Sequence, residues 1–304
     1  MAAAAFHSLA YATVRPPVSV DVAIRAQAGL GEGPRWDAAT RRLLWVDIDR
    51  SELHTFDPPS GRDDVSPVAG GVSAVAPMES GGRLLALTDR LAVLSADGGE
   101  RTVARMPHGE DVRLNDGACD PAGRFWVGSM RFDERPGGGA LYRYSPDGRL
   151  DPVLDDVSLS NGIGWSADGS AMYYIDSSSQ RLDVFDFDVE SGDASNRRPL
   201  VVFAESEGIP DGLAVDDEGC IWVALWDGAE VRRYTPDGRL DRTVAIPAAK
   251  VTACCFGGDD GRSFYITTAS VDLTPEQAAA QPLAGCVFVA DVGVSGPPAQ
   301  PFAG

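Results

Sequence analysis

Four oxygen-bearing side chains recur at one phase of an internal repeat, and together they could bind a cation. Glu32, Asn115, Asn161 and Asp211 each lie eight residues before a turn position that opens an apolar or aromatic run. Two carboxylates gathered in a partly buried place are unfavourable unless a cation compensates their charge. Because every donor is an oxygen, with no His or Cys among them, the set favours a hard divalent ion such as calcium, magnesium or manganese.

The elements that must position these residues are repeated β-strands. A turn followed by an apolar or aromatic strand recurs six times, at spacings of about 40–50 residues. The turn positions are Thr40, Gly82, Gly123, Gly169, Gly219 and Gly261. Glycine supplies the positive φ that a short hairpin turn requires. A second turn in each of the first five copies indicates four strands per repeat, and radial stacking of such units is a β-propeller.

The last repeat is short of one strand, and the N-terminal region offers it. Apolar residues alternate at period two through Val18, Val20, Val22 and Ile24. We therefore predict an all-β fold, a six-bladed β-propeller whose last blade is closed by the N-terminal strand. Residues 18–304 are expected to form this single domain, and residues 1–17 a flexible N-terminal extension.

Inner strands of a propeller surround one central channel, so the four polar side chains are expected to converge there. In the two remaining copies of the repeat, the equivalent position is held by Ala74 and Ala253. The alignment of these two copies can shift by one residue. The alternative is that each polar residue ends a strand and hydrogen-bonds to a loop backbone.

Arg113 lies two residues before Asn115, on the same face of an extended segment. An arginine beside a metal can hold a substrate hydroxyl or carboxylate, or stabilise an oxyanion. The alternative role is a salt bridge to Asp111 or Asp116.

Composition excludes several classes of function. The net charge is −19 and no basic residues are clustered, which argues against nucleic acid or an anionic membrane surface as a partner. Lys250 is the one lysine of the chain. The chain has three histidines, which argues against a multi-His zinc site and against a His-centred catalytic triad. No apolar run is long enough for a membrane span, and the N-terminus does not have the pattern of a secretory signal. The five cysteines lie mostly in apolar runs without Cys-x-x-Cys spacing, so we expect buried thiols and a cytoplasmic protein.

The chain resembles the SMP-30/gluconolactonase/regucalcin family from about Val20 to the C-terminus. The resemblance rests on ordered motifs: GEGPRWD, RLNDGACDPAGRFWVGSM, SNGIGWSADG, YYIDS, FDFD, SNRR, IPDGLAVDDEG, WVA, and CCFGG with its preceding lysine. It implies a divalent metal in the channel with Glu32, Asn161 and Asp211 as ligands, calcium first, and magnesium, manganese, zinc or iron as alternatives. Arg113 and Asn115 would contact substrate.

The family also uses an acidic residue shortly after the Gly-Ser-Met strand. In this sequence Asp133 aligns there without a gap, and Glu134 is the alternative. The segment departs from the commoner acidic pattern of the family, and the sugar preference depends on this contact.

The activity that the resemblance implies is that of a lactonase, a gluconolactonase-like carboxylic ester hydrolase of carbohydrate metabolism. It would open a sugar lactone to the aldonic acid, with the metal as Lewis acid and Asp211 as candidate general base. The alternatives are a related propeller esterase or phosphotriesterase and a non-catalytic calcium-binding protein. Sequence alone sets neither the preferred lactone nor the oligomeric state.

Overall fold

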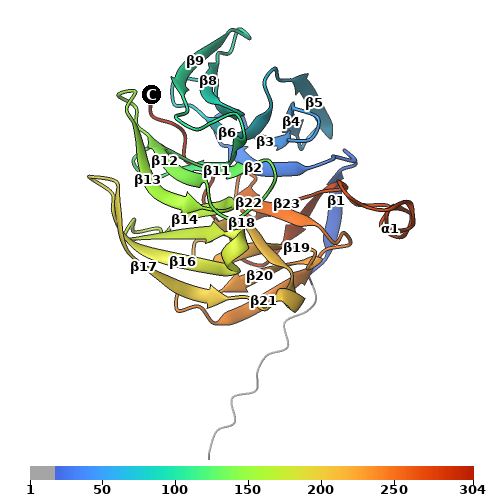
Figure 1. Ribbon diagram of the computed structural model, residues 1–304. Coiled ribbons are helices and arrows are strands. Elements are labelled where there is room, and N and C mark those ends of the chain that lie inside the picture. The colour runs from blue at the N-terminus through green and yellow to red at the C-terminus, as the bar shows by residue number, and fades with distance from the viewer. Residues whose placement is uncertain (1–17) are drawn as a thin grey trace, which may run out of the picture.

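The computed structural model describes residues 18–304, and within that range the strands form six four-stranded antiparallel sheets. The sheets are arranged as blades around a central axis, and α1 projects from the rim (Figure 1). The predicted all-β, six-bladed propeller is therefore confirmed. The expected N-terminal extension, residues 1–17, lies outside the described residues.

Blades 1 to 5 are built in chain order from the inner strand outward, and blade 6 takes its outer strand from the start of the chain. Blade 1 contains β2 (Gly31–Asp37), β3 (Arg42–Asp47), β4 (Glu52–Asp57) and β5 (Arg62–Pro67). Blade 2 contains β6 (Val72–Pro77), β7 (Arg83–Leu87), β8 (Arg90–Leu94) and β9 (Glu100–Arg105). Blade 3 contains β10 (Val112–Cys119), β11 (Phe125–Arg131), β12 (Gly139–Tyr144) and β13 (Leu150–Val157).

The second half of the ring follows the same plan. Blade 4 contains β14 (Ser160–Trp165), β15 (Ala171–Asp176), β16 (Arg181–Asp188) and β17 (Asp193–Val202). Blade 5 contains β18 (Ile209–Val215), β19 (Ile221–Trp226), β20 (Glu230–Tyr234) and β21 (Leu240–Ala245). Blade 6 contains β22 (Val251–Gly257), β23 (Ser263–Thr268) and β24 (Val287–Asp291). Short helical segments are η1 (Ser177–Ser179), η2 (Glu205–Glu207) and α1 (Pro275–Ala280).

Blade 6 is completed by the N-terminal strand, as predicted. β1 (Val20–Ile24) pairs antiparallel with β24, which places Val20 opposite Ala290 and Val22 opposite Phe288. The first and last strands of the chain thus share one sheet, and ring closure leaves fewer free sheet edges.

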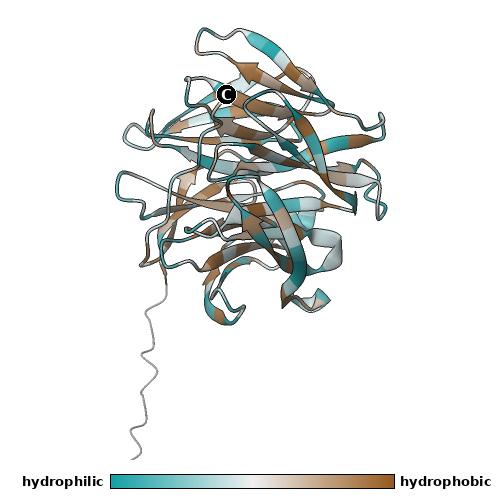
Figure 2. Ribbon diagram, turned by 90° about the vertical axis from the view of Figure 1, so that its left-hand side faces the viewer, coloured by the Kyte–Doolittle hydropathy of each residue, from teal (hydrophilic) through white to brown (hydrophobic). Residues whose placement is uncertain are grey.

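The hydrophobic core lies between the blades. Among the described residues, six clusters of buried apolar side chains occupy the junctions between adjacent blades. Trp45 lies between blades 6 and 1, Trp126 between blades 3 and 4, and Trp222 between blades 5 and 6. Hydrophobic segments run through the strands, while the outer strands β5, β9 and β17 are mostly exposed (Figure 2). Because the core lies at these junctions, the channel lining is free to carry polar groups.

Two of the tryptophans are fixed by an aspartate in an equivalent turn. Trp126 Nε1 donates to Asp120 Oδ2 at 2.9 Å, and Trp222 Nε1 donates to Asp216 Oδ2 at 2.8 Å. Asp216 also forms an ion pair with Arg233 at 2.8 Å. These carboxylates are fully buried and fully partnered, which makes them structural groups.

All five cysteines are free and buried, as the sequence predicted. Across residues 18–304 no helix has the length and apolar character needed to cross a membrane.

Candidate metal centre and active site

A β-bulge interrupts the inner strand of each described blade near the position that the repeat singled out. The pairing register shifts between Glu32 and Arg35, Leu114 and Gly117, Ser160 and Ile163, and Pro210 and Leu213. Asn115, Asn161 and Asp211 therefore lie inside bulges, and Glu32 begins one. Bulges re-aim side chains and are common next to active sites.

Blades 2 and 6 settle the register that the sequence left open. The residues that lack a ladder partner are Ser73 in β6 and Thr252 in β22. The equivalents of the polar positions are thus a serine and a threonine, one residue before Ala74 and Ala253. Both hydroxyls are buried, and Ser73 Oγ donates to Ala86 O at 3.4 Å.

Each predicted metal ligand follows a carbonyl group that is hydrogen-bonded from a neighbouring element. The bonds run from Thr252 Oγ1 to Gly31 O (2.6 Å), from Asn115 Nδ2 to Ser160 O (2.8 Å) and from Ser177 Oγ to Pro210 O (2.6 Å). Since Glu32, Asn161 and Asp211 come next in the chain, these bonds fix the backbone from which the three side chains project.

A chain of hydrogen bonds joins the predicted substrate residues to one predicted ligand. Arg113 Nη1 donates to Asn115 Oδ1 at 2.7 Å, and Asn115 Nδ2 donates to Asn161 Oδ1, also at 2.7 Å. Asn161 Nδ2 donates to Ser177 Oγ at 2.8 Å. The structure thus brings Arg113, Asn115 and Asn161 together. An amide oxygen accepts two bonds, so Asn161 Oδ1 keeps one lone pair for a further partner.

The two predicted acidic ligands, Glu32 and Asp211, are both buried, and their negative charges repel one another. Glu32 and Asp211 expose only 9% and 6% of their surface. Burial, followed by repulsion from Asp116, raises the pKa of Glu32 to about 8. Burial also raises the pKa of Asp211 well above its usual value, and the Glu32 carboxylate adds to the shift. Arg35 and Arg113 lower the pKa of Glu32 only in part. No positive group is among the causes that act on Asp211, so burial dominates both shifts.

This arrangement fits a hard divalent cation. Asp211 Oδ1 is buried and has no hydrogen-bond partner among residues 18–304. Within the same range no three His, Cys, Asp or Glu side chains gather as a metal cluster. A cation would therefore be held by Glu32 and Asp211 with the Asn161 amide oxygen as the third protein ligand, an all-oxygen donor set suited to calcium or magnesium.

Arg113 donates to Asn115, and neither of the two aspartates considered as its alternative partners forms a salt bridge with it in the structure. Asp111 pairs with Arg131 at 2.7 Å and Asp116 with Arg35 at 3.1 Å. Burial lowers the pKa of Arg113, and the carboxylates of Glu32 and Glu134 oppose that shift. A largely buried guanidinium beside two acids is well placed to bind an oxygen of a ligand.

The acidic loop after β11 places Asp133 and Glu134 differently. Asp133 is bound by Arg131 at 2.9 Å and Arg135 at 2.8 Å, which holds the pKa of its carboxyl well below its usual value. Glu134, with φ at +55°, is near enough to Arg113 to influence its charge. The Glu134 carboxylate therefore acts on Arg113 electrostatically, whereas the Asp133 carboxylate is bound by two arginines of its own loop.

One buried ion pair beside this site was not predicted. Arg35 Nη2 lies 3.1 Å from Asp116 Oδ1 and also donates to Gly117 O at 2.9 Å. Asp116 contributes to the raised pKa of both Glu32 and Asp211. Both residues stand in polar motifs next to predicted site residues, but the sequence gives no sign that they pair, since 81 positions separate them.

Comparison with known proteins places this geometry in context. The profile of the SMP-30/gluconolactonase/LRE-like region matches residues 30–270. The chain is 40% identical to regucalcin of Gallus gallus over 284 residues, covering 90% of this chain and 95% of that protein. It is 37% identical over 281 residues to YvrE of Bacillus subtilis (strain 168), provisionally named a sugar lactone lactonase, covering 91% of this chain and 96% of that protein.

A solved structure agrees with these sequence relatives. The crystal structure of a calcium-binding protein, regucalcin, from Agrobacterium tumefaciens superimposes with a TM-score of 0.91 at 29% identity. The match covers 94% of this chain and 98% of that one.

Proposed function

The chain belongs to the SMP-30/gluconolactonase/LRE-like family, and we propose that it hydrolyses a sugar (aldono-) lactone to the aldonic acid with one divalent cation in the channel. The observation that carries the proposal is the unpartnered Asp211 Oδ1 beside buried Glu32. The relative named for sugar lactone hydrolysis, which matches over nearly its whole length, supports the substrate class.

Glu32, Asn161 and Asp211 would hold the cation. When bound, it supplies a Lewis acid for the lactone carbonyl and compensates the two carboxylates. We propose calcium, because the donors are all oxygen and a structural relative is described as calcium-binding. Free, buried cysteines agree with a reaction in the cytoplasm.

Arg113 and Asn115 are the side chains proposed to bind the lactone during hydrolysis. Water adds to the carbonyl carbon, the bond from that carbon to the ring oxygen breaks, and the ring oxygen leaves as a hydroxyl group. Arg113 would donate to the oxygen that becomes negative during the addition. Asn115, fixed between Arg113 and Asn161, would orient a ring hydroxyl.

Asp211 is the proposed general base for the attacking water. Its carboxylate has two oxygens, so one could bind the cation while the other accepts the proton from water. A cation ligand is a weaker base than a free carboxylate, and the pKa raised by burial offsets part of that loss.

Sugar selection is assigned to the loop after β11. Asp133 was predicted to bind substrate, with Glu134 as the alternative, and we propose Glu134 because its carboxylate acts on Arg113.

The proposal is tested by measuring release of acid from glucono-, xylono- and arabinono-lactone above the rate in buffer. We expect acceleration with calcium, loss of the excess rate with chelator, and loss in Asp211→Asn. Asp237→Asn is the matched control, since the same chemical change is made at an exposed turn. No acceleration on any aldonolactone with any of the named metals would contradict the proposal.

A non-catalytic calcium-binding protein is the second candidate, favoured by the description of the Agrobacterium relative. It predicts tight calcium binding while Asp211→Asn and Arg113→Ala leave every tested activity at background. Aryl esters and phosphotriesters in the same assay identify a related esterase or phosphotriesterase.

A further inference from the structure

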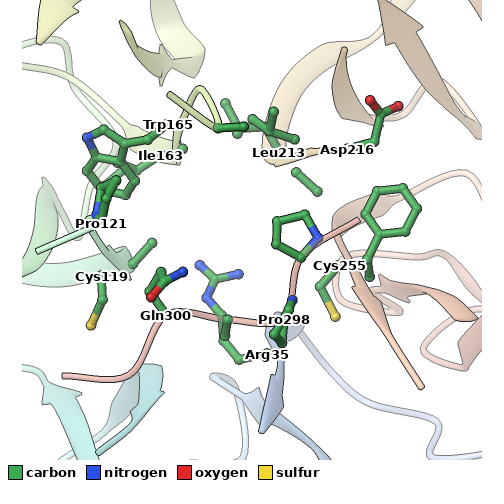
Figure 3. A pocket seen from close by; sticks show the side chains of 18 of the residues that line it. Arg35, Cys119, Pro121, Ile163, Trp165, Leu213, Asp216, Cys255, Pro298 and Gln300 are labelled. Atoms are coloured by element: carbon green, nitrogen blue, oxygen red, sulfur yellow. The ribbon is translucent and has the colours of Figure 1, made fainter. Parts of the chain in front are cut away.

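The inner strands enclose a second space, at the end of the channel opposite the candidate metal centre. The metal-end residues stand near the starts of β2, β14 and β18, whereas this cavity is lined by later residues of the inner strands. Its volume is about 290 Å³. Figure 3 shows the side chains around it, with Arg35 and Gln300 on one side and Ile163 and Leu213 on the other.

The cavity walls are mainly apolar. They include Ile163, Leu213, Cys119, Cys255 and Pro298. Asp216 also lies at the wall, but both of its oxygens are already bonded within the fold. The surface offered to a ligand is therefore suited to an apolar body.

Arg35 brings a positive group into this apolar space. Its guanidinium points into the cavity in Figure 3, and its side chain is 12% exposed. Nη2 donates to Asp116 and Gly117 O, and Nη1 donates to Pro34 O. The Nε hydrogen and the second Nη1 hydrogen have no acceptor in residues 18–304. Donors of a largely buried cation gain from an acceptor, and a carboxylate is the strongest one.

The C-terminal segment fixes the shape of the cavity. Pro297, Pro298, Ala299 and Gln300 run along it. Ala299 N donates to Trp36 O in blade 1, and further along the segment Phe302 N donates to Pro77 O in blade 2. The segment is thus held by backbone bonds, and the cavity is preformed.

We propose that this cavity is a second small-molecule site, for a compact and mainly apolar monocarboxylate. The carboxylate would accept from the free hydrogens of Arg35, and an aliphatic or single aromatic ring would lie against Ile163, Leu213 and Pro298. The volume is near the lower limit of ligand pockets, which restricts the ligand to a small molecule. The inference does not depend on lactone hydrolysis, because no metal-end side chain takes part.

The test measures binding of 4-fluorobenzoate to the full-length protein by fluorine NMR. Val215 and Ala118 line the cavity from β18 and β10. Val215→Phe should fill it and weaken binding at least tenfold, while the matched Val215→Ala should stay within about threefold of wild type. Equal affinity for Val215→Phe and wild type would overturn the proposal, as would no saturable binding up to about 10 mM.

Ligand chemistry tests the role of Arg35 without disturbing its pair with Asp116. 4-Fluorobenzamide has the same ring without the charge, and it should bind at least fivefold more weakly than 4-fluorobenzoate. Equal binding of the amide would overturn the assignment of a carboxylate ligand.

Location is tested separately from the proposed activity. Chelator and a saturating aldonate should change the affinity for 4-fluorobenzoate by less than about threefold, even if lactone hydrolysis proves absent, because only the electrostatic effect of the Arg35–Asp116 pair joins the two sites. Displacement by the aldonate would place the probe at the metal end and overturn the proposal. If Val215→Phe does not fold, Ala118→Leu takes its place. In crystals soaked with 4-bromobenzoate, the bromine anomalous peak must lie in this cavity.

Discussion

The two ends of the channel are built from the same inner strands but treat buried charge in opposite ways. At the metal end, Asp211 has an oxygen without a partner and lies beside another buried carboxylate, Glu32. At the other end, five residues along the chain, Asp216 accepts from Trp222 and Arg233 and from two backbone amides. Burial costs the same kind of desolvation in both places, but only Asp216 recovers it within the fold. The difference indicates that Asp216 serves stability, and it agrees with the proposal that Asp211 binds a cation.

The ion pair between Arg35 and Asp116 links the two ends. Asp116 acts electrostatically on Glu32 and Asp211, while Arg35 lines the opposite cavity. Pairing keeps a third buried carboxylate from adding its full charge to the metal end.

The largest effect is expected for Asp211→Asn. Loss of the free carboxylate should lower kcat/KM for the preferred lactone by about a thousandfold or more. The metal-free protein should keep its stability or gain up to about 2 kcal/mol, since an unpartnered buried carboxylate is removed. Initial rates and urea unfolding in chelator measure the two quantities. A clear loss of metal-free stability would break the contrast with Asp216.

Asp216→Asn should show the reverse pattern. Trp222 Nε1 and Arg233 would lose their shared acceptor in a fully buried place, at a cost of about 3–5 kcal/mol in the free energy of unfolding. The folded fraction should keep kcat within about twofold of wild type, because Asp216 lies away from the metal end. Urea unfolding gives the first value and active-site titration the second. A selective loss of activity at wild-type stability would contradict the structural role.

The pH dependence of metal-free stability should separate the two ends further. The pKa of Glu32 is raised from 4.5 to about 8 in the fold. Between these values the folded state holds a proton that the unfolded state releases, so stability falls as pH rises. Replacing Glu32 with Gln should reduce this fall by about 2–3 kcal/mol between about pH 5.5 and 7.5. The measurement is urea unfolding in chelator across that range, and an unchanged slope in Glu32→Gln would show that the carboxylate is not buried as described.

The smallest effect is expected in the loop after β11. Glu134→Gln should raise KM by about three- to tenfold, because its carboxylate acts on Arg113. Asp133→Asn is the matched control and should change KM less than about twofold, since Asp133 is held by Arg131 and Arg135. The opposite ranking in steady-state kinetics would return the substrate contact to Asp133.

Local pattern was enough to predict most of the fold. Strand and turn periodicity depends on residues that are neighbours in the sequence. The blades could therefore be predicted from the sequence, as could the β1 strand that completes the last blade. The repeat also showed that Glu32, Asn115, Asn161 and Asp211 stand at equivalent positions in their copies. Hydrogen bonds in the structure confirm that Arg113, Asn115 and Asn161 lie together. Assignment of these residues to metal and substrate stays a prediction.

What the sequence determined by itself was therefore the repeat, the ring and the type of side chain offered at each inner strand. Tertiary structure decided the rest. The bulges put Ser73 and Thr252, not the neighbouring alanines, at the equivalent positions. Tertiary structure also paired Arg35 with Asp116 across 81 positions and placed the C-terminal segment along the cavity opposite the candidate metal centre. These features depend on which strands become neighbours and how their ladders slip, and no periodicity within one strand carries that information.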